Sequence, residues 1–257
     1  MILQTRIPHD FGIHRPLPNV SPLSMNDWLL ADEAFAAQMA ERERLIAGKR
    51  DAVIAMDEGA RSAAEELLQT VLGRLPGPFR REGSRVIRPD GVAVGIDTSD
   101  PMATLGLLVQ EDLCLLEKRG GDEHLLTGAV LCFPAGWRLA QKYMRPLSEI
   151  HSPIPEYDAA IAARVQRLFD GVRPDRPLVR WNRLWHDDPA LFQPGSRQHD
   201  ADRVEPRTAP YFRSERQCLV RLPETGAVVF SIHTYVVARD DYGDGLPAAE
   251  KPPSAII

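Results

Sequence analysis

Residues 212–237 read FRSERQCLVRLPETGAVVFSIHTYVV, two apolar runs joined by the turn sequence Pro223-Glu224-Thr225-Gly226. Val228, Phe230, Ile232 and Thr234 alternate along the second run. A period of two on both sides of a short glycine-containing turn predicts an antiparallel β-hairpin over 212–222 and 227–237. This hairpin defines the class of sheet that the rest of the chain joins.

Two charged residues stand near the start of the first run of this hairpin. Arg213 and Glu215 are two positions apart, so their side chains share one face of the strand. A buried charge requires a partner, so an Arg–Glu pair on the inner face would indicate a functional site. On the outer face, the same pair would be a solvated ladder of charges.

Further strands are expected upstream of the hairpin. Arg119-Gly120-Gly121-Asp122 predicts a hairpin turn, and Glu111-Asp112 has the spacing of another. The apolar runs that predict these strands are residues 92–94, 105–109, 113–116, 125–133 and 178–185.

Helical periodicity appears in three other segments. Residues 27–47, 51–73 and 157–169 carry apolar side chains at helical spacing, and Gly171 closes the third. Proline-rich residues 1–24 predict an extended arm, residues 193–210 a polar surface loop, and the segment from Arg239 onward a tail.

This order of elements predicts an α+β fold with one antiparallel sheet, helices on one face and space for a ligand between them. It fits a PAS-like sheet with an N-terminal helical extension, and other antiparallel-sheet folds fit nearly as well. The expected division is an arm and helical extension over 1–78, a ligand-binding domain over 79–238 and a flexible tail over 239–257.

Composition restricts the class of function. The chain has 257 residues, a net charge of −5 and three isolated cysteines. The acidic balance argues against nucleic-acid binding, and three cysteines cannot by themselves hold a four-cysteine iron–sulfur cluster. No apolar stretch of membrane-spanning length and no signal-peptide pattern is present, so we expect a cytoplasmic protein with no membrane partner.

The central segment from Cys132 to Pro155 carries the candidate chemistry. Pro153 and Pro155 push the residues before them toward extended conformations, which holds His151 on a stiff connection. A loop histidine that binds a carbonyl is the ordinary role of such a residue. One histidine is nevertheless enough to ligate a heme iron, because the porphyrin supplies four nitrogens.

Other side chains are candidates with ordinary alternatives. Trp137, Arg138 and Lys142 could line a pocket and pair with carboxylates, or be a core Trp with surface cations. His124 begins a predicted strand and is a second candidate ligand, whereas the alternation around His233 favours a half-buried structural role. No zinc motif, serine nucleophile elbow or phosphate-binding glycine loop occurs.

An ordered series of motifs resembles the alpha-subunit family of heme-dependent oxidative N-demethylases, formerly a domain of unknown function. The series spans residues 90–237 and therefore most of the chain. Its members are Val109 to Leu116, His124 to Gly128, Cys132-Phe133-Pro134 with Trp137, Lys142, Ile150 to Pro155, Asp187-Asp188-Pro189, Arg213 to Gln217 and Arg221-Leu222-Pro223.

The resemblance implies a PAS-like domain that binds heme b and demethylates a small secondary or methylated amine with O2. Electrons would come from NADPH through separate flavin and iron–sulfur reductase components. His151 falls in the family's Ile-His-x-Pro motif, which implies the proximal iron ligand, and His124 stays an alternative. Trp137, Arg138 and Lys142 would contact the cofactor.

For the amine, the resemblance favours Glu215 as its carboxylate partner, beside Arg213 and with Glu111 and Asp112 as alternatives. Two positions depart from the family pattern, namely the order Trp181-Asn182 and the presence of His233 in place of an arginine. A non-catalytic heme- or small-molecule-binding sensor with the same fold is the alternative function. A domain that has lost the heme site is a third.

Overall fold

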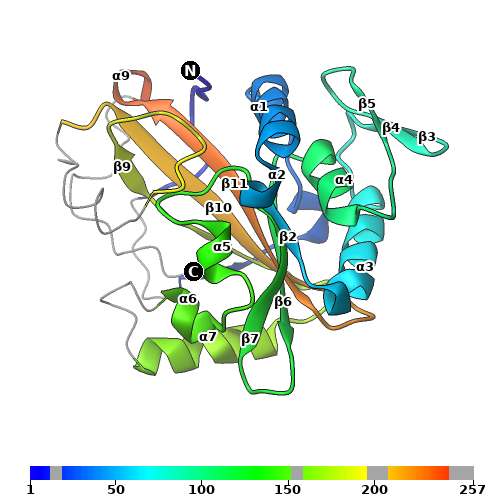
Figure 1. The fold of residues 1–257 in the computed structure, drawn as a ribbon. Coiled ribbons are helices and arrows are strands. Elements are labelled where there is room, and N and C mark those ends of the chain that lie inside the picture. Colours follow the sequence, from blue (N-terminus) through cyan, green and yellow to red (C-terminus); the bar gives the residue numbers. More distant parts are fainter. Residues whose placement is uncertain (12–18, 152–158, 196–207, 243–257) are drawn as a thin grey trace.

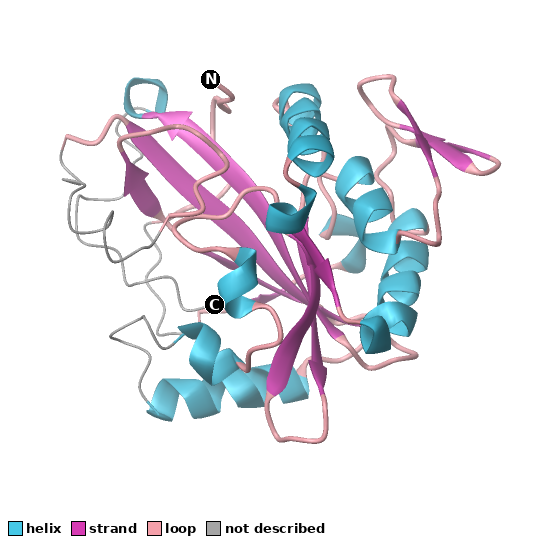
Figure 2. Ribbon diagram, in the orientation of Figure 1, coloured by secondary structure: helices cyan, strands magenta, loops and turns pink. Residues whose placement is uncertain are grey.

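The computed structural model describes residues 1–11, 19–151, 159–195 and 208–242. Its centre is an antiparallel sheet that bends through the molecule, with helices packed on both sides (Figures 1 and 2). The α+β class with an antiparallel sheet, predicted from the sequence, is therefore confirmed.

The main sheet has eight strands in the order β1-β8-β10-β11-β6-β7-β2, and β9 also pairs with β10. Each of these neighbours is antiparallel. A separate meander of three strands, β3-β4-β5, projects from the body (Figure 1). The strands are β1 (Ser21–Pro22), β2 (Ile54–Met56), β3 (Arg80–Glu82), β4 (Arg85–Ile87), β5 (Ala93–Gly95), β6 (Asp112–Lys118), β7 (His124–Val130), β8 (Leu178–Trp181), β9 (Leu184–His186), β10 (Tyr211–Arg221) and β11 (Val228–Ala238).

The helices form two groups on opposite sides of β10 and β11 (Figure 1). The first group shares a core with Val229, and the second shares a core with Phe230. The expectation that helices cover one face is wrong, because neighbouring apolar residues of β11 point to opposite faces and each face needs cover. The first group comprises η1 (Met25–Asp27), α1 (Phe35–Gly48), α2 (Arg50–Val53), η2 (Glu58–Ala60), α3 (Arg61–Leu72) and α4 (Pro101–Leu108); the second comprises α5 (Leu139–Lys142), α6 (Leu147–His151) and α7 (Ala159–Gly171), while α9 (Arg239–Tyr242) follows β11.

The β10–β11 hairpin is the longest ladder of the sheet and confirms the predicted hairpin. Its register pairs Glu215 with Thr234 and Gln217 with Ile232, without interruption from Tyr211 to Arg221. Directly paired residues in an antiparallel ladder share a face. The predicted β6–β7 hairpin is confirmed in the same way, with Lys118 opposite His124 across the turn.

The predicted strand at residues 105–109 is wrong, because this segment is helix α4. Asp100 caps the helix by accepting a hydrogen bond from the Ala103 amide, and Pro101 occupies its first turn. The helix is buried nearly all round, so it lacks the polar face that would reveal a helical period. The capping pair Asp100-Pro101 is a helix-start signal that the apolar run obscured.

Gly106 explains how this helix fits against the sheet. A Cβ at this position would lie 2.5 Å from Val130 Cγ2 and 2.8 Å from Ile46 Cδ1. Both distances are shorter than real contacts allow, so the glycine permits close approach of α4 to β7 and α1.

The turn predicted at Glu111-Asp112 is also wrong, because helix α4 rather than a strand precedes it.

Three other predicted elements are interrupted. The helix expected over 27–47 begins only at Phe35, and the helix expected over 51–73 is broken by β2, which joins the main sheet. The strand expected over 178–185 divides into β8 and β9 at Asn182 and Arg183. Local periodicity did not predict the breaks at β2, β8 and β9, because these strands form through pairing with distant strands.

The remaining expectations concern the chain ends and the domain division. Gln4 binds both backbone groups of Val236, so the described part of the arm lies along β11. Most of the 193–210 loop and the tail beyond Tyr242 lie outside the described residues. The division at 78 and 238 stays a prediction; Leu67 and Val71 of α3 pack in the same core as Val229.

Candidate functional site

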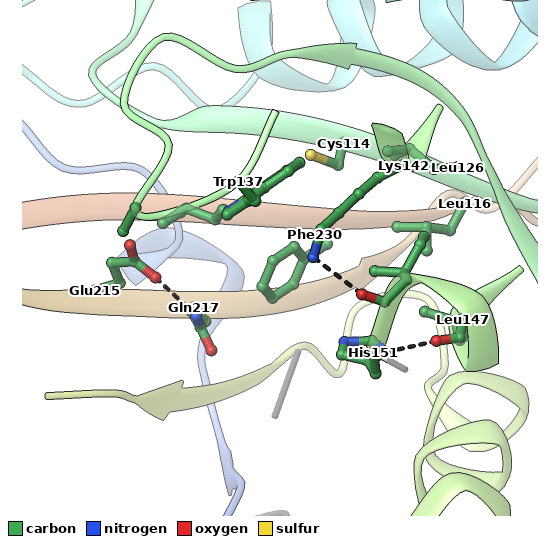
Figure 3. A pocket seen from close by; sticks show the side chains of 13 residues that line it. Cys114, Leu116, Leu126, Trp137, Lys142, Leu147, His151, Glu215, Gln217 and Phe230 are labelled. Carbon is green, nitrogen blue, oxygen red and sulfur yellow. Dashed lines mark hydrogen bonds between the residues drawn. The ribbon is translucent and has the colours of Figure 1, made fainter. Parts of the chain in front are cut away.

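A narrow pocket lies between β10–β11 and the second group of helices (Figure 3). The pocket is small, with a cavity volume of about 60 Å³. Apolar side chains form most of its wall, with polar groups at two ends. The lining residues are Cys114, Leu116, Leu126, Ala135, Trp137, Lys142, Leu147, Ile150, His151, Glu215, Gln217, Phe230 and Ile232.

His151 occupies one end of the pocket, at the C-terminus of the short helix α6. It is 1% exposed, and its Nδ1 donates a hydrogen bond of 2.6 Å to the Leu147 carbonyl oxygen. A neutral imidazole that donates through Nδ1 carries a lone pair on Nε2. A hydrogen bond from the other ring nitrogen to a carbonyl oxygen is typical of histidines that bind metal, because it fixes the tautomer and the orientation of the ring. The prolines that follow His151 lie outside the described residues.

Lys142 and Trp137 form the wall beside this histidine. The Lys142 ammonium lies 4.7 Å from the centre of the Trp137 ring and donates a hydrogen bond of 3.0 Å to the Ile150 carbonyl oxygen. These contacts join α5 to α6 and place a positive charge at the pocket wall. Lys142 is thus able to pair with an acidic group of a ligand.

The other end of the pocket is built by Glu215 on β10. Its Oε2 accepts hydrogen bonds from Asn182 Nδ2 at 2.6 Å and from Gln217 Nε2 at 3.0 Å. Arg213 Nη2 lies 3.5 Å from Oε1. Arg213 and Glu215 are 1% and 6% exposed, so the pair lies on the inner face. This is the arrangement that indicates a functional site, because two charges are buried at the edge of a cavity.

Arg213 also connects the pocket to two distant segments. Its guanidinium donates to the carbonyl oxygens of Phe133 at 2.6 Å and Leu191 at 3.1 Å. The departure from the family pattern at Trp181-Asn182 lies at the Glu215 end of the pocket, because Asn182 Oδ1 also accepts a hydrogen bond of 2.7 Å from the backbone amide of Glu215. Arg213, Asn182 and Gln217 thus hold the carboxylate of Glu215 in place.

Two further polar residues near Glu215 were not singled out in the sequence. Gln217 lines the pocket two positions after Glu215, and Thr234 lies directly opposite Glu215 on β11. They are 2% and 1% exposed. Among the described residues, Gln217 Oε1 and Thr234 Oγ1 have no hydrogen-bond partner. The spacing from Glu215 was a usable signal for Gln217, because alternate strand residues share a face.

Two predicted cofactor contacts lie away from the pocket lining. Arg138 is exposed and donates a hydrogen bond of 2.9 Å to the Pro194 carbonyl oxygen. His124 is buried against Phe169, and its Nδ1 accepts a hydrogen bond of 3.1 Å from Gln166. Burial lowers the pKa of His124, which keeps the ring neutral.

Glu111 and His233 lie on the opposite face of the sheet from the pocket. His233 Nδ1 is 3.0 Å from Glu111 Oε1, and His233 Nε2 is 3.2 Å from Asp32 Oδ2. Burial by itself would lower the pKa of His233, but its contacts with Asp32 and Glu111 outweigh burial and raise the pKa to about 9. His233 is therefore a buried cation with two carboxylate partners.

Asp112 also has a structural role rather than a place in the pocket lining. Its carboxylate binds Arg42 Nη1 at 2.6 Å and accepts the amides of Cys132 at 2.7 Å and Phe133 at 2.8 Å. These bonds fix the start of the segment that leads to Trp137. Asp112 and Glu111 are thus engaged outside the pocket lining, and of the predicted carboxylates Glu215 alone lies in that lining.

The part of the chain that the structure describes has neither a protein-held metal cluster nor a membrane-spanning helix. No cluster of three or more His, Cys, Asp and Glu side chains has the arrangement of a metal site there. No described helix is long and apolar enough to cross a membrane.

A buried histidine with a fixed tautomer and a buried carboxylate thus lie at the two ends of one apolar pocket in an α+β protein. The family model described as "Haem-dependent oxidative N-demethylase, alpha subunit-like" matches residues 19–244. This match covers the sheet, the pocket and both groups of helices. The chain belongs to this family.

Proposed function

We propose that this protein is the heme-binding subunit of an oxidative N-demethylase. It would act on a small secondary or methylated amine with O2 and take electrons from separate flavin and iron–sulfur reductase components. The observation that carries the proposal is His151, buried in the pocket wall with Nδ1 bonded to the Leu147 carbonyl oxygen. Its Nε2 lone pair is the donor that a heme iron requires.

The chemical character of the other lining residues suits a heme b, although a porphyrin would have to widen this small pocket. Leu116, Leu126 and Phe230 give an apolar surface suited to a porphyrin, and Lys142 supplies a cation for a propionate. Bound heme would supply activation of O2, while the protein supplies ligation, pocket polarity and access control. We further propose that the sheet with α5–α7 corresponds to the PAS-like domain of the resemblance, and the N-terminal helices to its extension.

The chain's own residues would bind and orient the amine. A small amine is protonated at neutral pH, and the Glu215 carboxylate supplies the opposite charge. Arg213 and Asn182 hold that carboxylate in place, at 3.5 Å and 2.6 Å. The apolar wall excludes water, which strengthens electrostatic interactions inside the pocket. Because this chain has three cysteines, an iron–sulfur cluster with four thiolate ligands would belong to a partner.

Absorption spectroscopy of the purified, heme-supplemented protein tests the cofactor. We expect a Soret band that His151→Ala abolishes or shifts, because this change removes the proximal ligand. His124→Ala is the matched control, since His124 is also a buried histidine but does not line the pocket. A colourless wild-type protein, or a band lost only in His124→Ala, would contradict the proposal.

Turnover is tested separately, with an electron source supplied to the heme-loaded protein. We expect consumption of reductant and O2 that depends on the amine, with release of formaldehyde. A Soret band without amine-dependent consumption would instead support the sensor or carrier role.

A further inference from the structure

On the pocket-facing side of β10 and β11, two buried side-chain oxygens have no hydrogen bond. These atoms are Gln217 Oε1 and Thr234 Oγ1, as judged among the described residues. Native proteins pair nearly all buried polar atoms, so each exception requires an explanation. Gln217 lines the pocket, and the explanation that its position favours is a ligand that supplies the missing hydrogen bonds.

The orientation of the Gln217 side chain is fixed by its neighbour. Its Nε2 donates to Glu215 Oε2 at 3.0 Å, and the same oxygen accepts from Asn182 at 2.6 Å. Because a carboxylate oxygen accepts hydrogen bonds, the amide nitrogen of Gln217 faces Glu215 and its Oε1 points elsewhere. Figure 3 shows Gln217 and His151 on opposite sides of Phe230.

The register of the hairpin places Thr234 beside Gln217 on the same face of the sheet, although Thr234 is not part of the pocket lining. Thr234 pairs directly with Glu215, and Gln217 pairs with Ile232, so Gln217 and Thr234 are diagonal neighbours on one face. Diagonal neighbours are separated by about 7–8 Å at the backbone, a spacing at which one small molecule can contact both side chains. A hydroxyl both donates and accepts, whereas Gln217 Oε1 only accepts.

We propose that Gln217 and Thr234 form the hydrogen-bonding subsite that orients the amine, with Gln217 Oε1 accepting an N–H of the substrate. Glu215 is then a positioning residue as well as a counter-charge, because it holds the Gln217 amide in the orientation that exposes Oε1. This inference rests on the proposed function for the identity of the ligand as an amine.

The subsite predicts a preference that charge alone does not produce. Dimethylammonium has two N–H groups and can bond to Gln217, whereas tetramethylammonium carries the same charge and has none. A purely electrostatic site beside Glu215 would admit both ions according to size, while the subsite selects for the N–H group.

Calorimetric titration of the heme-loaded, full-length protein with dimethylammonium chloride and tetramethylammonium chloride tests this inference. We expect wild-type protein to prefer dimethylammonium. Gln217→Met keeps the length of the side chain and removes the acceptor, and should weaken dimethylammonium binding by about tenfold or more, the scale of a hydrogen bond to a charged group. Its affinity for tetramethylammonium should stay unchanged.

Thr234→Val should weaken dimethylammonium binding by a smaller factor. Its matched control is Thr127→Val, because Thr127 is a buried strand threonine whose hydroxyl is already paired, donating to Glu117 Oε2 at 2.6 Å. Thermal unfolding of each variant verifies that it is folded.

Equal dimethylammonium affinity in wild type and Gln217→Met would mean that the two atoms bind buried water only, and would overturn the inference. So would absence of dimethylammonium binding to wild-type protein, or loss of the Soret band in Gln217→Met. If no heme binds, the proposed function fails by itself, and the same titration on heme-free protein still decides the role of Gln217.

Discussion

The two faces of the β10–β11 hairpin carry different kinds of polar cluster. One face has the arm-facing cluster, which consists of Asp32, Glu111 and His233 with the amides of Gln38 and Gln110. The other has the pocket-facing cluster of Arg213, Glu215, Gln217 and Thr234. Both are buried, and both contain charges of opposite sign.

The difference lies in what the side chains contact. In the arm-facing cluster, Asp32 Oδ1 accepts from Gln110 and from the Ala34 amide, and Glu111 Oε1 accepts the Leu30 amide at 2.9 Å. These bonds fasten the N-terminal segment to the sheet. Glu111 Oε2 lacks a described partner, but Glu111 contacts His233 on the face of the sheet opposite the pocket. In the pocket-facing cluster, the unpaired oxygen of Gln217 belongs to a cavity wall.

This contrast separates a structural polar network from a binding one. A satisfied buried network rigidifies the fold, whereas an unsatisfied group beside a cavity is a site for a ligand. The two clusters should therefore respond in opposite ways to mutation, with stability affected on the arm-facing side and ligand affinity on the pocket-facing side.

The largest expected effect is that of His233→Leu. The change leaves the buried carboxylate of Glu111 and the partly buried carboxylate of Asp32 without their cation, and breaking a buried charge pair costs about 3–5 kcal/mol of unfolding free energy. Urea unfolding measures this loss, while dimethylammonium affinity of the folded protein should stay the same. A loss below about 1 kcal/mol would show that the arm-facing cluster does not fasten the arm.

The pH dependence of stability should be the next largest effect. The pKa of His233 is raised from 6.5 to about 9, so its stabilising contribution is complete below pH 6.5 and is lost as the pH rises through 9. Linkage makes this loss roughly 3 kcal/mol. The pKa of Asp32 is lowered from 3.8 to about 2, because its contacts with His233 outweigh the opposite effect of burial.

The contribution of Asp32 is present above pH 3.8 and lost as the pH falls through 2. The Asp32 and His233 contributions come from the same ion pair, so the two free energies are not added. Urea unfolding as a function of pH should thus give a maximum between these windows, at mildly acidic pH. The alkaline slope should be absent in His233→Leu, and a slope that persists there would assign it to another group.

Glu215→Gln should have an intermediate effect that appears in both properties. The amide turns an N–H group toward Arg213, Asn182 or Gln217, each of which donates to or faces the carboxylate. Hydrogen bonds to a charged group contribute about 1.5–3 kcal/mol, so we expect a loss of that order in urea unfolding. Calorimetry should also show weaker dimethylammonium binding; unchanged affinity would remove Glu215 from the site.

The smallest effect on stability should be that of Gln217→Met. It removes one hydrogen bond to Glu215 but also removes an unpaired buried oxygen, and the two terms of about 1–3 kcal/mol oppose each other. We expect little change in unfolding free energy. Gln110→Met is the matched control, since the Gln110 side chain makes three hydrogen bonds and should lose stability. Equal losses in the two variants would erase the distinction between the faces.

Local patterns predicted the parts of the fold that depend on local pairing. The period of two predicted β10 and β11 and placed Arg213 and Glu215 on one face. It did not predict α4, because a segment buried on all sides shows no periodicity, nor β2, because three residues become a strand only through pairing with β7.

The candidate site divides in the same way. Trp137, Lys142, His151 and Glu215 were singled out in the sequence and lie in the pocket lining, whereas Arg138 and His124 do not. Asn182 was noted only as a departure from the family pattern, and its bond to Glu215 spans 33 positions. Contacts over such separations depend on the assembled sheet, so a single sequence does not reveal them.

The uninterrupted register of the β10–β11 ladder also constrains how this family's sequences can change in length. Side chains alternate with a period of two, so an inserted or deleted residue within either strand would exchange the two faces. His233 and Arg216 would enter the pocket, and Glu215 and Gln217 would leave it. We expect insertions and deletions to be confined to the Pro223–Gly226 turn, while substitutions alone diversify the strands.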